Sequence, residues 1–144
     1  MSITTVGIIG AGTMGNGIAQ ACATCGINVV MIDVSDQAVA KGLATVSSSL
    51  DRLVKKEKIT AVDKTAALAR IQGSTSYDDL KTAQLVIEAA TENYDLKVKI
   101  VKQLDALLAP EVIVASNTSS ISITKLAAVT HRADRFIGMH FFNP

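Results

Sequence analysis

Three glycines near the start of the chain have the spacing of a phosphate-binding loop. The stretch GAGTMG places Gly10, Gly12 and Gly15 between a β-branched run and a helix-like segment. There, the first glycine permits a tight turn, the second lets backbone N–H groups approach a pyrophosphate, and the third lets helix and strand pack closely. The positive end of the helix dipole faces the phosphates. The loop predicts a dinucleotide site, and a glycine-rich turn without a ligand is the alternative interpretation.

An acidic residue follows where a ribose would need it. Asp33 ends the second apolar run, eighteen residues after Gly15. A carboxylate at that place accepts hydrogen bonds from the adenosine ribose hydroxyls. It would also repel a 2′-phosphate, and the neighbouring DVSDQ contains no Arg or Lys to offset that charge. The pattern favours NAD over NADP. In the alternative interpretation Asp33 or Asp36 caps the next helix, and we expect Asp36 to do so.

A histidine is the candidate base. Imidazole has a pKa near 7, so a histidine side chain can accept or donate a proton at neutral pH. Of the two histidines, His131 lies in the polar stretch THRADR, which favours a solvated surface residue, whereas His140 follows an apolar run. We expect His140 at the carboxyl edge of the sheet, where open α/β sheets bind ligands. Ser119 follows the preceding apolar run and is expected in the same crevice. For Ser120 or Ser122 a capped loop is the alternative.

The elements that position these residues alternate between strand-like and helix-like segments. Nearly continuous apolar runs are typical of strands buried on both faces of a parallel sheet. Helix-like stretches at 14–25 and 95–109 lie between such runs. The alternation predicts right-handed crossovers and a Rossmann-type, doubly wound α/β fold with a mostly parallel sheet. The predicted strands are 4–10, 27–33, 84–90, 111–117 and 135–141.

A helical hairpin is expected after the second strand. From Ser35 to about residue 58, apolar residues recur at steps of four and three, which predicts a helix of about twenty residues. Thr60, with Asp63 three residues later, predicts the capped start of a second helix. A short strand is expected near 71–76.

Length and composition limit the class of protein. The chain has 144 residues, of which 49% are hydrophobic and 19% charged, which fits one globular domain over 1–144. A net charge of +1 gives no argument for nucleic acid, and the apolar runs are too short for a membrane span. We expect a cytoplasmic protein because the start of the sequence lacks the pattern of a secretory leader. Cys22 and Cys25 form C-x-x-C within a helix-like stretch, which favours small packing residues over a redox pair.

Three motifs together carry a family resemblance. With GAGTMGNGIAQ, then SNTSS at 116–120 and HFFNP at 140–144, the sequence resembles the NAD-binding domain of the 3-hydroxyacyl-CoA dehydrogenases. The resemblance runs from the first strand to the last residue. It implies an oxidoreductase of fatty acid metabolism that moves a hydride between NAD and C3 of a 3-hydroxyacyl-CoA, interconverting it with the 3-oxoacyl-CoA.

The resemblance also implies roles for particular residues, and it implies no metal ion. His140 would be the base, Ser119 would hydrogen-bond the same substrate oxygen, and Asn117 would lie beside the nicotinamide. Ser49 and Lys56, together with Ser119, would contact the CoA substrate, although cations at the end of a helix need no ligand. The implied cofactor contacts are Gly10, Gly12, Thr13, Met14, Gly15, Asp33, Ala89, Glu92, Lys97 and Asn117.

The family continues beyond HFFNP with a glutamate that orients the histidine and with a helical domain. We expect the chain without them to bind NAD, to have little activity and to be monomeric, and the full-length protein to be a homodimer through the helical domain. One alternative is a non-catalytic module that senses NAD(H). Another is a different 3-hydroxyacid dehydrogenase, such as the 3-hydroxyisobutyrate type, against which the SNTSS and HFFNP pair argues.

Overall fold

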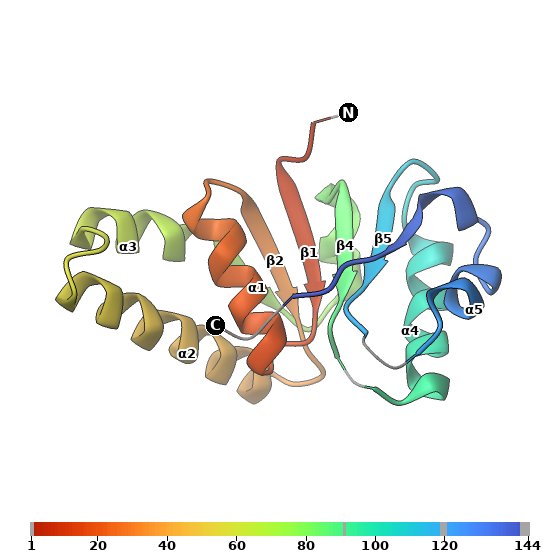
Figure 1. Cartoon of the computed structure of the whole chain (residues 1–144), viewed down its shortest axis with the longest axis horizontal. Coiled ribbons are helices and arrows are strands. Elements are labelled where there is room, and N and C mark those ends of the chain that lie inside the picture. The colour runs from red at the N-terminus through yellow and green to blue at the C-terminus, as the bar shows by residue number, and fades with distance from the viewer. Residues whose placement is uncertain (1, 91, 119–120, 142–144) are drawn as a thin grey trace.

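The sheet is the centre of the molecule. The computed structural model describes residues 2–90, 92–118 and 121–141. Six strands, all parallel, lie in the order β3-β2-β1-β4-β5-β6 with helices on both faces (Figure 1). The strand order reverses between β1 and β4, and ligands of such sheets bind at that point, beyond the carboxyl ends of the strands. The predicted doubly wound α/β fold is confirmed.

Each predicted strand is present but shorter than its apolar run, because the residues at its ends leave the sheet to form loops. The strands are β1 (Thr5–Ile9), β2 (Asn28–Ile32), β3 (Ile71–Ser74), β4 (Leu85–Glu88), β5 (Ile113–Ser116) and β6 (Phe136–Gly138). The α-helices are α1 (Thr13–Thr24), α2 (Asp36–Lys55), α3 (Ala61–Ala69), α4 (Tyr94–Leu107) and α5 (Ile123–Ala128), with short 3₁₀ helices η1 (Tyr77–Thr82) and η2 (Ala133–Arg135).

Alternating strand side chains build one core on each face of the sheet. Val6 and Ile8 of β1 pack in the core that includes residues of α1, α2 and α3. Ile9 and Val86 belong to the other core, with residues of α4 and α5. Figure 1 shows the two groups of helices on opposite sides of the strands. The continuous apolar runs therefore reflect burial on both faces.

The helical hairpin forms as predicted, with one correction to its start. Ser35 caps α2, because its side chain accepts a 3.1 Å hydrogen bond from the Ala38 N–H. The expectation that Asp36 caps this helix is wrong. Ser35 has the extended backbone of a cap, whereas Asp36 is already helical and places its charge in the first turn. Thr60 and Asp63 form the predicted reciprocal capping box of α3.

Two further features bear on the sequence expectations. Burial raises the pKa of the Cys22 thiol, and the nearby Cys25 adds to the effect, so the thiolate of Cys22 is disfavoured. Cys22 also packs against the core, as expected of a packing residue, whereas Cys25, the C-cap residue of α1, is exposed. None of the helices in the described part of the chain is long and apolar enough to cross a membrane.

Candidate functional site

The three loop glycines meet different surroundings. Gly10 has a φ of +111°, and a Cβ there would lie 2.8 Å from the Ala89 carbonyl oxygen. A Cβ on Gly15 would lie 1.8 Å from the Gly10 carbonyl oxygen, so helix and strand approach too closely for any side chain. A Cβ on Gly12 would meet nothing within 4 Å. Packing explains two of the glycines, and the open space at Gly12 fits the approach of a ligand.

The start of α1 has the properties of an anion site. Gly12 is the N-cap residue, no side chain of the described residues caps the helix, and no acidic residue lies in its first turn. The first N–H groups of a helix have no partner within it, and the helix dipole is positive there. The backbone of Thr13 and Met14, which begin α1, therefore presents donors that fit a pyrophosphate.

Asp33 is fixed beside this loop at the end of β2. Its Oδ2 accepts a 2.9 Å hydrogen bond from the Ala11 N–H, and its Oδ1 accepts one of 2.7 Å from the Val34 N–H. The Gly10 N–H donates to the Ile32 carbonyl at 2.7 Å, which ties the same two segments together. The carboxylate is thus oriented, and its remaining lone pairs can accept ribose hydroxyls.

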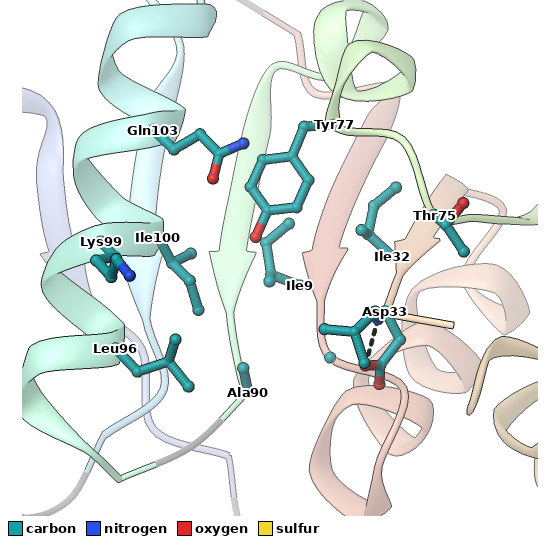
Figure 2. Close-up of a pocket in the computed structure, with 12 residues that line it drawn as sticks. Ile9, Ile32, Asp33, Thr75, Tyr77, Ala90, Leu96, Lys99, Ile100 and Gln103 are labelled. Atoms are coloured by element: carbon teal, nitrogen blue, oxygen red, sulfur yellow. Dashed lines mark hydrogen bonds between the residues drawn. The ribbon is translucent and has the colours of Figure 1, made fainter. Parts of the chain in front are cut away.

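A cavity of about 500 Å³ lies next to Asp33. It lies between the carboxyl ends of β1 and β2, the segment leading into η1, and α4 (Figure 2). The predicted cofactor contacts Gly10 and Asp33 line it, but sequence reasoning did not find the rest of its wall, because those residues come from separate segments and carry no motif. Its lining includes Ile9, Val34, Tyr77, Leu96, Ile100 and Gln103.

Under the site lies a buried ion pair that sequence reasoning also missed. Glu88 and Lys97 are both 0% exposed, with Lys97 Nζ 2.5 Å from Glu88 Oε1. The same oxygen accepts a 2.7 Å hydrogen bond from Ser116 Oγ, and Oε2 accepts one of 2.8 Å from the Ala90 N–H. Glu88 therefore joins the ends of β4 and β5 to α4. The sequence does contain a signal for this pair, because the apolar run LVIE ends on a charged residue, Glu88.

Two predicted cofactor contacts, Lys97 and Glu92, lie at this ion pair. Lys97 lies in the floor of the site, paired with Glu88, and not on its surface. Its Nζ is 4.0 Å from Glu92 Oε1, and the Glu92 side chain is 49% exposed. Thr118 Oγ1 donates a 2.9 Å hydrogen bond to Glu92 Oε2, linking the loops after β4 and β5. Contact of Glu92 or Lys97 with a cofactor stays a prediction.

The structure brings two of the predicted catalytic segments together. The Asn117 N–H donates to the Glu88 carbonyl at 2.8 Å, and Asn117 Oδ1 accepts a 3.1 Å hydrogen bond from the Phe141 N–H. The Met139 N–H donates to the Ser116 carbonyl at 3.1 Å. His140, which is exposed, is held between these two anchored neighbours. Ser119 lies outside the described residues.

A second cavity, of about 590 Å³, lies between α1, α2 and Phe141. Ser49 lines it together with Thr13 and Met14. Lys56 is the exposed C-cap residue of α2 and does not line this cavity, whereas Arg52, one turn earlier, does. Sequence reasoning did not single out Arg52, although its helical spacing from Ser49 places both on one face.

The two remaining predictions concern the surface. His131 is solvated as predicted, with 98% of its side chain exposed and its Nδ1 3.1 Å from Asp105 Oδ2. Ser122 caps α5, as the capped-loop alternative had it, by accepting a 3.3 Å hydrogen bond from the Lys125 N–H. Neither residue belongs to the site.

The family model for the NAD binding domain of 3-hydroxyacyl-CoA dehydrogenase matches residues 5–144. A 3-hydroxybutyryl-CoA dehydrogenase of Bradyrhizobium diazoefficiens is 53% identical over 142 residues, which are 99% of this chain and 48% of that protein. One of Clostridioides difficile is 44% identical over 137 residues, covering 95% of this chain and 49% of that protein.

A solved structure agrees. The crystal structure of an (S)-3-hydroxybutyryl-CoA dehydrogenase from Ralstonia eutropha superposes with a TM-score of 0.98 at 78% identity. The match covers 99% of this chain and 50% of that one. The chain thus spans about half the length of the relatives it matches.

Proposed function

The chain belongs to the 3-hydroxyacyl-CoA dehydrogenase family as its NAD binding domain, and we propose that it holds the cofactor and the base of an enzyme that oxidises 3-hydroxyacyl-CoA to 3-oxoacyl-CoA. In this reaction the C3 hydroxyl becomes a ketone. NAD, when bound, accepts the hydride from C3. The proton of the hydroxyl goes to a protein base, so that charge and electrons balance.

The cofactor-binding residues follow the ends of the strands. Gly12 leaves room for the pyrophosphate, which the N–H groups that begin α1 would bind. Asp33 would accept hydrogen bonds from the adenosine ribose. The cavity beside Asp33 would then hold the adenine, and the opposite end of the dinucleotide would lie over Ala89, Glu92 and Asn117 at the ends of β4 and β5.

His140 is the proposed general base. A neutral imidazole within hydrogen-bond reach of the C3 hydroxyl accepts its proton as the hydride leaves. Asn117 is bonded to the backbone next to His140, which supports placing that imidazole beside the nicotinamide end of the site. Ser119 would donate a hydrogen bond to the same substrate oxygen. The two side chains would thus orient the C3 hydroxyl.

The CoA portion of the substrate is proposed to lie in the cavity between α1 and α2. Ser49 offers a hydroxyl there, and Arg52 offers a guanidinium suited to phosphate. Phe141 lines the same cavity one residue after the base, so a substrate bound along it would lead toward His140. Lys56 would interact with the part of CoA that extends beyond the cavity.

The observation that carries the proposal is the 3.1 Å hydrogen bond between Asn117 Oδ1 and the Phe141 N–H, which joins the two motif segments at the carboxyl edge of the sheet. The test is His140→Gln in the full-length protein. We expect turnover to fall by roughly 10²–10⁴, as on loss of a positioned base, with cofactor affinity nearly unchanged. Turnover within threefold of the unmodified enzyme would remove His140 from this role.

A further inference from the structure

The cavity beside Asp33 contains polar side chains that the fold does not use. Tyr77, Lys99 and Gln103 line it, and no side-chain hydrogen bond or ion pair joins any of them to another of the described residues. Figure 2 shows the Gln103 carboxamide extending from α4 across the cavity toward the Tyr77 ring. The mechanism proposed above gives these groups no role. Donors and acceptors that face a cavity in this way suit a ligand with a hydrogen-bonding edge.

The apolar part of the cavity wall is suited to a flat ring. Val34 is 94% exposed and Leu96 is 46% exposed, and they line this cavity from opposite sides, Val34 from the loop after β2 and Leu96 from α4. Exposed apolar side chains of this size are few among the described residues, and two of them line this one cavity, which indicates an apolar ligand surface between them. Binding an aromatic base between them would remove both side chains from water.

The chemistry of Gln103 matches one edge of one base. A carboxamide offers an acceptor oxygen beside donor N–H groups. The Hoogsteen edge of adenine offers the complementary pair, the 6-amino donor and the N7 acceptor, which Gln binds bidentately in other contexts. We propose that Gln103 reads this edge, with Oε1 accepting from the 6-amino group and Nε2 donating to N7, and so makes the cofactor site selective for adenine.

This inference rests on the proposed function, because Asp33 must hold the adjoining ribose for the base to enter the cavity. Hypoxanthine is the informative competitor, since it differs from adenine in carrying an oxygen in place of the 6-amino group. Its Hoogsteen edge has two acceptors, so Gln103 can satisfy only one of them and leaves its own Oε1 facing an oxygen. A dinucleotide with hypoxanthine therefore loses one hydrogen bond and gains a repulsion.

The test is titration of the chain with NADH and with reduced nicotinamide hypoxanthine dinucleotide, followed by nicotinamide fluorescence. We expect NADH to bind roughly tenfold more tightly. Gln103→Ala should bring this ratio close to one, mainly by weakening NADH. Gln103→Met, which keeps the length of the side chain, should do the same. Lys102→Ala is the matched control, because Lys102 precedes Gln103 on α4, is exposed and does not line the cavity, so the ratio should persist.

The titrations distinguish failure of base recognition by Gln103 from failure of the whole cofactor site. If the unmodified chain binds both dinucleotides equally, or if the tenfold ratio survives Gln103→Ala and Gln103→Met, base recognition by Gln103 is wrong while the cofactor site stands. If the folded chain binds neither dinucleotide, the proposed function fails and base recognition fails with it. A ratio that disappears in both Gln103 variants and persists in Lys102→Ala supports the inference.

Discussion

At the scale of single residues, the site separates positions that serve the fold from positions that serve the ligand. Gly10 and Gly15 are required by contacts that the chain makes with itself, whereas Gly12 faces open space. Asp33 belongs to both groups, because it fastens the loop through the Ala11 N–H and still has acceptor capacity toward a ribose. Substitutions can therefore remove binding and leave the fold intact.

The glycines give the sharpest contrast. Gly12→Ala should change the free energy of unfolding by at most about 1 kcal/mol, the scale of an N-cap exchange, yet weaken NADH binding at least tenfold because the methyl group occupies the space of the pyrophosphate. Gly15→Ala should instead lower the free energy of unfolding, because its Cβ would lie 1.8 Å from the Gly10 oxygen. Urea unfolding and NADH titration of both variants test this. Equal losses of stability would contradict it.

Asp33 sets the choice between the two nicotinamide cofactors. The unmodified chain should bind NADH much more tightly than NADPH, since the carboxylate repels a 2′-phosphate, and Asp36 in the first turn of α2 adds negative charge nearby. In Asp33→Ala the preference should narrow, because NADH loses its hydrogen bonds while NADPH loses the repulsion. Fluorescence titration with both cofactors measures it. Equal affinities in the unmodified chain would refute the argument.

At the scale of elements, buried charges hold helix α4 at both of its ends, to β4 of the sheet at its start and to the segment between α5 and η2 at its end. Near its start, Lys97 pairs with Glu88 at the end of β4. Near its end, Asp105 pairs with Arg132, whose guanidinium also donates to the carbonyls of Leu108 and Val112. The loops that carry Glu92 and Asn117 lie at the first of these anchors.

Breaking the anchor at Glu88 should be costly. Lys97→Met leaves a buried carboxylate with no cation, and removing one partner of such a pair costs about 3–5 kcal/mol. Lys102→Met, an exposed change on the same helix, should cost less than about 0.5 kcal/mol. Adding Glu88→Gln to Lys97→Met should recover part of the loss. Urea unfolding decides, and similar effects of the two lysine substitutions would show that the pair carries no such energy.

The other anchor predicts how stability changes with pH. Burial raises the pKa of Asp105, but hydrogen bonds from Arg132 and His131 outweigh burial, so the pKa lies below its usual value. A lowered pKa in the folded state means that the carboxylate stabilises the fold above the pKa of the unfolded chain, and that this contribution is lost as the pH falls through the folded pKa. Asp105→Asn should therefore destabilise the chain at pH 7 and flatten the loss of stability in acid. Thermal unfolding between pH 7 and pH 3 tests this, and parallel curves would contradict it.

Local sequence patterns predicted the helices and strands. They did not predict features that depend on backbone angles or on contacts between distant residues. The apolar runs and the Thr60–Asp63 capping box are readable within a few residues of sequence. The Ser35 cap was missed because Ser35 and Asp36 are both good capping residues, and backbone angles decide between them. The partners of Glu88 lie 9 and 28 residues away, so only the packing of α4 and β5 against β4 brings them together.

At the scale of the whole molecule, we infer that cofactor binding needs only this chain, whereas catalysis needs more of the protein. The residues proposed to bind NAD lie within this chain, between Gly10 and Asn117, whereas the chain spans about half the length of its relatives. A general base needs a partner that orients it and a pocket that excludes water. We expect the chain to bind NAD by itself and to form only part of the catalytic site.

The most direct measurement compares the isolated chain with the full-length protein in two assays, NADH titration and steady-state oxidation of 3-hydroxybutyryl-CoA with NAD. We predict saturable NADH binding by the isolated chain, with an affinity within about tenfold of the full-length protein, a difference of about 1.4 kcal/mol. We also predict that the isolated chain turns over at less than a tenth of the full-length rate. A folded chain that fails to bind NADH, or one that turns over at more than a tenth of that rate, would contradict these predictions.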